Sequence, residues 1–196
     1  HWNEREVTSV EDRKGERHAA DLVISTCHPA ELLRLTGPGG LRPSLEKRVR
    51  ETPDSASAVL VFAALSRPPR TLGCRHHIAR CVLPESRVDS ELYFLAPGNF
   101  HASEEEQADH PLLEAMVWVP CDSVAAWRGS QKGDRPEDYE AWKRAREAEI
   151  LASVTALHPE LEGTIERVWS STPLSIQHYV RSRNGAAMGL SHDIGK

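Results

Sequence analysis

The spacing of hydrophobic and polar positions changes twice along the chain. In the first part of the chain this spacing predicts a strand pair followed by a helix. A polar turn at 12–15 separates two β-prone runs, Glu6 to Val10 and Ala19 to Ser25. Within the second run, Leu22-Val23-Ile24 is unbroken and apolar, which is typical of a parallel strand covered on both faces. Pro29 then opens a short helical pattern, because proline is tolerated at a first helical position. This order predicts an α/β layer.

The middle part of the chain predicts an antiparallel sheet. After the Gly-rich stretch from Gly37 to Pro43, our candidate domain boundary, Ser44 to Arg50 has the pattern of a short polar helix. Four strand-like runs follow, at Ala56 to Leu65, His76 to Leu83, Glu91 to Leu95 and Leu112 to Pro120. Consecutive strands without helices between them pair as antiparallel neighbours. The polar segment from Pro97 to His110 predicts a loop.

The last third of the chain is predominantly helical in its pattern. Pro136 to Leu157 predicts the longest helix, and one face of it collects Tyr139, Trp142, Ile150, Val154 and Leu157. Arg146 falls on the same face, and we interpret it as a snorkelling side chain or half of a surface ion pair. The remaining elements are a strand over Thr164 to Ser170, a helix over Pro173 to Tyr179 and a turn at Asn184-Gly185. The pattern as a whole therefore predicts a mixed α/β (α+β) fold.

Composition narrows the classes of partner and compartment. The 24 Lys and Arg residues are outnumbered by 29 Asp and Glu residues, and the net charge of −5 argues against nucleic acid as a partner. The four cysteines form no CxxC pair, which favours free thiols in a reducing, cytoplasmic compartment. No apolar run reaches the roughly 20 residues that a membrane-spanning helix needs. The first residues are polar and lack an initiator Met, so we expect a longer protein around this chain.

No catalytic motif is complete within the chain. Two cysteines and two histidines lie between Cys74 and Cys81, but their spacing does not match the separated pairs of structural zinc sites. We therefore predict no metal, and we interpret the acidic run Glu104 to Glu106 as part of a solvated loop. The chain also lacks GxSxG, the P-loop, HExxH and GxGxxG. Catalytic residues are unknown at this level.

Two segments resemble one family of enzymes. Ala20 to Pro29 reads ADLVISTCHP and resembles the AD-x-V-[IV]-S-N-x-x-P segment of flavin-dependent phytoene desaturases, carotenoid isomerases and retinol saturases. In that family a Gly-containing hairpin comes before this segment, as Gly15 does here. Ser171 to Leu190 resembles the family's TP-x-[ST]-x-x-x-Y and G-[AS]-x-x-G pair. At Cys27-His28 the chain departs from the family's usual small polar pair.

The resemblance implies a division of the chain into three parts. Residues 1–40 would be the last strands of an FAD-binding, Rossmann-like domain, and residues 41–180 would form a substrate domain with an antiparallel sheet and packed helices. Residues 181–196 would return toward the flavin domain. The GxGxxG segment that grips the flavin pyrophosphate through backbone N–H groups is not in this chain.

The resemblance also implies functional residues and a reaction class. Ser25, Thr26, Gly185 and Gly189 would approach FAD, with the glycines allowing close contact to the backbone. Thr172, Pro173 and Tyr179 would approach the substrate. The expected activity is FAD-dependent desaturation, saturation or isomerisation of a hydrophobic, polyene or isoprenoid substrate, with this chain alone inactive. A non-catalytic binding domain and an amine-oxidase-like flavoenzyme remain alternatives, and peripheral membrane contact stays open.

Overall fold

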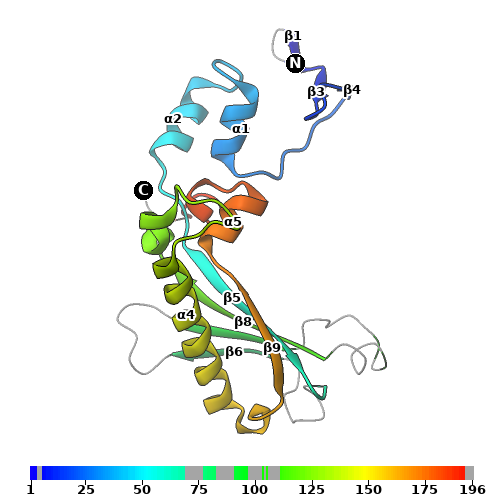
Figure 1. The fold of residues 1–196 in the computed structure, drawn as a ribbon. Helices are drawn as coiled ribbons and strands as arrows, with labels where there is room; N and C mark the ends of the chain where they lie inside the picture. Colours follow the sequence, from blue (N-terminus) through cyan, green and yellow to red (C-terminus); the bar gives the residue numbers. More distant parts are fainter. Residues whose placement is uncertain are drawn as a thin grey trace.

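The computed structural model shows a small N-terminal unit joined to a larger sheet-and-helix body (Figure 1). It describes residues 1–3, 6–68, 77–82, 91–96, 103, 105 and 111–192. The expected loop over 97–110, apart from residues 103 and 105, therefore lies outside the described residues, as do residues 74–76 of the Cys74 to Cys81 cluster. Among the described residues, no helix is long and apolar enough to cross a membrane.

The N-terminal unit begins with two antiparallel strand pairs. β1 (Trp2–Asn3) pairs with β2 (Glu6–Val7), and β3 (Ser9–Glu11) pairs with β4 (Arg17–Ala19). The Asp12 carboxylate closes the β3–β4 turn by accepting the backbone N–H groups of Lys14 and Glu16. The expected hairpin around Gly15 is confirmed.

The expected continuation of the second strand to Ser25 is wrong. β4 ends at Ala19, and the segment that follows has no strand structure. Leu22 is 77% exposed and Ile24 is 79% exposed, so neither side chain is covered. An apolar run becomes a buried parallel strand only when neighbouring strands pair with its backbone and helices cover both faces. No described strand pairs with this run.

Two short helices complete the N-terminal unit; both were predicted, although the boundary expected at 37–43 lies between them. α1 (Pro29–Thr36) begins after His28, whose Nδ1 accepts the backbone N–H of Ala30. This side-chain cap satisfies one of the amide groups that a helix start leaves unpaired. α2 (Pro43–Glu51) follows the Gly-rich turn and buries only Val49.

The body is built on a five-stranded, wholly antiparallel sheet, which confirms the predicted fold class. Its spatial order is β6-β7-β8-β5-β9. The strands are β5 (Ser57–Leu65), β6 (His77–Val82), β7 (Glu91–Ala96), β8 (Leu112–Val119) and β9 (Ile165–Ser171). β5 lies between β8 and β9, which places residues far apart in the sequence side by side.

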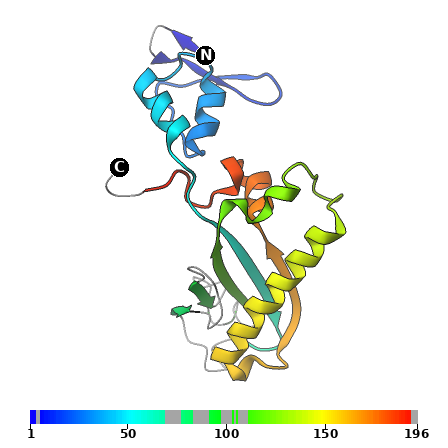
Figure 2. The same ribbon diagram turned by 90° about the vertical axis from the view of Figure 1, so that its left-hand side faces the viewer.

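One face of this sheet carries the main core and is covered by α4 (Glu137–Leu157) (Figures 1 and 2). Alternate residues of β5 and β8, such as Val61 and Ala115, pack against Ile150 and Val154 of the helix. The predicted helix face is confirmed except at its end, where Leu157 is 42% exposed because the helix extends past the packed strands. Arg146 forms a surface ion pair with Glu149 at 2.8 Å, as expected.

The upper end of the body holds three shorter elements. α5 (Pro173–Val180) follows β9 directly and was predicted, as was the turn now seen as the 3₁₀ helix η4 (Arg183–Gly185). The 3₁₀ helix η2 (Cys121–Trp127) after β8 was not predicted, and η3 (Pro159–Leu161) links α4 to β9. Tyr139 and Leu174 pack with Val124 into a second small core.

Candidate functional site

A buried cluster brings the two resemblance segments together. Asp54 lies just before β5, and its carboxylate accepts Nε of Arg183 at 2.7 Å and Nδ2 of Asn184 at 2.8 Å. Nε2 of His28 lies 3.4 Å from the same carboxylate. We call His28, Asp54, Arg183 and Asn184 the Asp54 hub. It joins the end of the first segment to the last part of the second across more than 120 positions of sequence.

The contacts of the hub orient the His28 ring. His28 uses Nδ1 as the acceptor that caps α1, so in the neutral ring Nε2 carries the hydrogen and faces Asp54. The side chains of His28 and Asp54 are only 2% and 7% exposed. Arg183 also donates to the backbone carbonyls of Thr52 and Val49. The buried Asp54 carboxylate accepts from Arg183 and Asn184 and lies beside His28, so it orients all three side chains.

Gly185 and Pro173, both predicted to lie at the site, are in close contact with each other. Gly185 has a φ of 75°, and a Cβ on it would lie 2.2 Å from the carbonyl oxygen of Pro173. The carbonyl of Gly185 accepts the buried Ser57 hydroxyl at 2.5 Å. This packing explains the glycine without any ligand.

Thr172 is fully buried next to Pro173. Its hydroxyl is 2.8 Å from the Tyr139 hydroxyl, and its backbone N–H donates to Oγ of Ser175 in the first turn of α5. Burial raises the pKa of Tyr139, which keeps its hydroxyl neutral. Thr172 and Pro173 thus fix the start of α5.

The other predicted residues lie at exposed or half-buried positions on the linker before α1, at the end of α5 and after η4. Ser25 and Thr26 are exposed on the linker before α1, and Oγ of Ser25 lies 3.0 Å from Sγ of Cys27. Gly189, with a φ of 79°, accepts the Ser55 amide and lies against Pro29. Tyr179 is 65% exposed at the end of α5, where its hydroxyl contacts Nζ of Lys132. These placements leave their predicted roles as predictions.

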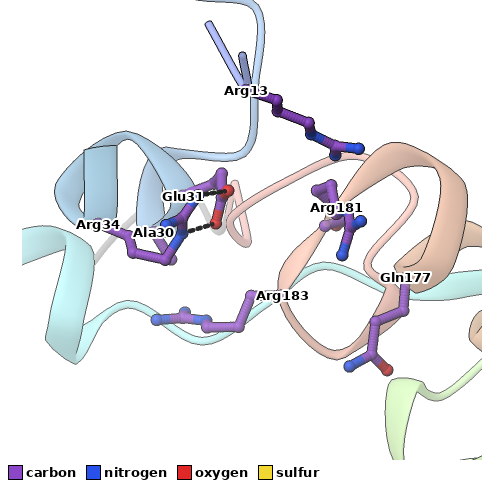
Figure 3. A pocket seen from close by; sticks show the side chains of 8 residues that line it. Arg13, Ala30, Glu31, Arg34, Gln177, Arg181 and Arg183 are labelled. Carbon is purple, nitrogen blue, oxygen red and sulfur yellow. Dashed lines mark hydrogen bonds and ion pairs between the residues drawn. The ribbon is translucent and has the colours of Figure 1, made fainter. Parts of the chain in front are cut away.

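Beside the hub lies a cavity of about 660 Å³ between the β3–β4 hairpin, α1 and α5 (Figure 3). Its lining residues are mostly charged or polar: Arg13, Ala30, Glu31, Arg34, Gln177, Arg181, Ser182 and Arg183. Nε and Nη2 of Arg34 hold the Glu31 carboxylate at 2.9 and 2.6 Å. This hydrogen bonding lowers the pKa of Glu31, so the single acid of the lining stays ionised. Sequence reasoning missed these arginines because they come from three separate segments.

A smaller cavity of about 420 Å³ lies on the η2 side of Asp54. Cys121 lines it and donates its thiol to the carbonyl of Ser55 at 2.9 Å. Burial raises the pKa of Cys121, so its thiol is protonated and weakly nucleophilic. This cavity therefore offers no activated nucleophile.

The face of the sheet opposite α4 is a third surface of functional interest (Figure 2). No helix among the described residues covers it. Its half-buried or exposed apolar side chains are Leu60, Phe62, Met116, Trp118 and Trp169. Phe62 and Trp169 stack with ring centroids 6.0 Å apart. Glu114 lies opposite Phe62 in the β5–β8 register, and burial raises its pKa. We call this surface the open face.

One group of side chains has metal-ligand spacing in the described part of the chain. Asp12, Glu16 and His18 converge in the β3–β4 hairpin, but all three are exposed. The Asp12 carboxylate already accepts hydrogen bonds from two backbone N–H groups of its own turn. The group is explained by the hairpin, and it gives no support for a metal.

The chain is similar to known reductases over part of their length. It is 37% identical over 70 residues to the all-trans-retinol 13,14-reductase of Homo sapiens, covering 36% of this chain and 12% of that protein. It is 24% identical over 174 residues to the all-trans-retinol 13,14-reductase of Danio rerio, covering 78% of this chain and 28% of that protein. The chain thus spans less than a third of these relatives. No family model matches it.

Proposed function

We propose that this chain is the substrate-domain portion of a FAD-dependent oxidoreductase that acts on a hydrophobic, isoprenoid substrate such as a retinoid. The observation that carries the proposal is the similarity to all-trans-retinol 13,14-reductases over 174 residues. Those relatives are named as reductases, which favours saturation of a double bond over desaturation or isomerisation. The same names favour a polyene substrate over the amine of an amine-oxidase-like enzyme.

The open face supports a hydrophobic substrate. Its aromatic and aliphatic side chains lie on the central strands β5 and β8 and on the edge strand β9, where ladder hydrogen bonds fix the backbone. Small-molecule sites are mainly apolar with a few placed polar groups, and the open face has this composition, with Glu114 and Arg167 among its polar members. A flat, apolar substrate would stack on Phe62 and Trp169.

The fit to FAD is partial within this chain. Ser25 and Thr26 are exposed on the linker that leads to His28 of the Asp54 hub, so both are accessible to a cofactor. Pro173 fills the space at the Cβ position of Gly185, whereas only a ring carbon of Pro29 lies within 4 Å of the Cβ position of Gly189. When bound, FAD would supply the hydride chemistry, while this chain positions the substrate. Ser25, Thr26 and Gly189 are the contacts we propose, and the pyrophosphate grip would come from a GxGxxG segment not in these residues.

The location of the protein follows from the same proposal. A free-thiol protein with a hydrophobic substrate would be cytoplasmic or attached to the surface of a membrane. The rival hypothesis is a binding domain without catalysis. It predicts retinoid binding but no flavin absorbance in the longer protein.

The experiment is a purification of the longer protein that includes this chain, followed by an absorbance spectrum and an assay with all-trans-retinol. We expect flavin bands and a saturated product. Trp169→Ala should raise KM several-fold with little change in flavin content, because it removes a stacking surface for the substrate. Leu157→Ala is the matched control, since Leu157 is 42% exposed and Trp169 43% exposed but only Trp169 lies on the open face. Absence of flavin bands would refute the proposal.

A further inference from the structure

The cavity beside the Asp54 hub has a strong excess of positive charge. Four arginines line it, Arg13, Arg34, Arg181 and Arg183, against the single carboxylate of Glu31. They come from the β3–β4 turn, α1 and the segment after α5. Such a lining attracts anions, because low-dielectric walls concentrate the field of the charges.

Two of these arginines are neutralised by neighbours and two are not. Arg34 pairs with Glu31 at 2.6 Å, and Arg183 pairs with Asp54 at 2.7 Å. Arg13 and Arg181 have no acidic partner within ion-pair distance among the described residues. The cavity therefore keeps about two positive charges without a counter-charge from the described chain.

The two unpaired side chains reach toward the same space. Figure 3 shows Arg13 extending from the hairpin toward α5, where Arg181 stands on the facing wall. Arg181 also has a φ of 59°, a left-handed conformation uncommon for a side-chain-bearing residue. This conformation ends the helix, because Arg181 is the C-cap of α5, and the side chain therefore leaves from the last turn of α5. Glu31 lies near enough to Arg181 for its charge to be felt, but Glu31 is already paired with Arg34, so Arg13 and Arg181 remain free to hold an anion.

A further polar atom in the cavity lacks a partner. Gln177 also lines the cavity, and its Oε1 is buried without a hydrogen-bond partner, although the amide points away from Arg13 and Arg181 in Figure 3. A buried acceptor without a donor is costly, so a ligand hydroxyl there would be favourable. The Ser182 hydroxyl is already used, since it donates to the carbonyl of Ala186.

We propose that this cavity binds the phosphate group of an organic phosphate ester through Arg13 and Arg181. A phosphate carries nearly two negative charges and so matches the two unpaired arginines, and its oxygens accept the forked N–H groups of guanidinium. The cavity volume of about 660 Å³ exceeds what a phosphate alone needs and falls within the usual range of small-molecule sites. The organic part of the ester would lie along Gln177. The inference does not depend on FAD.

The test is calorimetric titration of this chain with inorganic pyrophosphate at about 0.1 M salt, with vesicles of phosphatidic acid or of phosphatidylcholine in parallel. We expect pyrophosphate to bind and Arg13→Gln with Arg181→Gln to weaken it at least about tenfold, since charge-assisted hydrogen bonds are lost. Binding of pyrophosphate alone identifies a soluble phosphate ester, and preferential binding of phosphatidic acid vesicles identifies a lipid headgroup.

The control is Arg167→Gln, which removes the same charge from the exposed surface of β9. It should leave the affinity within about twofold, because that arginine is remote from the cavity, as surface charges more than a Debye length away are largely screened. Circular dichroism checks that each variant is folded. An equal loss in the control, or no binding of either probe to the folded chain, overturns the proposal.

Discussion

At the scale of single residues, Gly185 combines two constraints that a side chain violates. Its φ of 75° is unfavourable for any residue with a Cβ, and the Pro173 carbonyl fills the space that a Cβ would need. Gly163 has a similar φ of 74° but nothing within 4 Å of the Cβ position. Comparing substitutions at Gly185 and Gly163 therefore separates the cost of the left-handed backbone from the cost of steric overlap.

We expect Gly185→Ala to lower the free energy of unfolding by roughly 2–5 kcal/mol, of which about 1–2 kcal/mol is left-handed strain and the rest overpacking. Gly163→Ala should lose only the strain. Urea denaturation of both variants measures the difference. Equal losses would show that the Pro173 contact relaxes freely and that Gly185 is kept for another reason.

Glu114 predicts a pH dependence of stability. Burial raises its pKa above the ordinary 4.5, so the folded protein binds this proton more tightly than the unfolded chain does. Its contribution to stability is therefore full below pH 4.5 and is lost as pH rises through the raised pKa. Glu114→Gln should raise the melting temperature at pH 7 and change it little at pH 4. Glu166→Gln, at an exposed position of β9, should shift neither.

At the scale of elements, local patterns predicted most helices and strands because each carries its own start, period and stop. The α1 helix has Pro29 at its start and Gly37 after its end, and β5 has an apolar face and a neighbour on each side. The predicted length of the second hairpin strand was wrong, because a strand also requires a partner strand, which sequence periodicity does not reveal. η2 was missed because a 3₁₀ helix is too short for a period.

The exposed run Leu22 to Ile24 gives an element-scale prediction. In this chain Leu22→Ser with Ile24→Ser should change the free energy of unfolding by no more than about 1 kcal/mol, since both side chains are exposed. Leu113→Ala, in the fully packed β8, should cost about 2–5 kcal/mol. Thermal unfolding measures both. If the longer protein pairs this run as a parallel strand, the same double substitution will be severe there and mild here.

The candidate site could be predicted only in part. Motif resemblance placed residues 20–29 and 171–190 at one site, and the structure brings His28 and Arg183 together at Asp54. Asp54 itself carried no signal, because a lone acid before a strand has no distinguishing pattern. The arginine-lined cavity could not be predicted either, since tertiary contacts bring its arginines together from segments that are distant in the sequence.

At the scale of the whole molecule, the Asp54 hub is the main polar connection between the N-terminal unit and the body. His28 begins α1 on one side, while Asp54 and Arg183 belong to the body on the other. His28→Ala removes both the helix cap and the contact with Asp54. His28→Asn keeps a residue that caps helices well but is too short to place a ring nitrogen at the carboxylate.

We therefore expect faster amide hydrogen exchange in α1 and α2 of His28→Ala, while exchange in α4 and β5 stays at the wild-type rate. Local opening of a unit with few buried contacts requires less free energy than global unfolding, and the loss of its anchor lowers that energy further. The cap alone accounts for about 1 kcal/mol, so His28→Asn reports the contribution of the hub. If His28→Asn restores wild-type exchange in α1, the cap and not the hub holds the two parts together. Equal acceleration in α1 and α4 would show instead that the two parts unfold as one cooperative body.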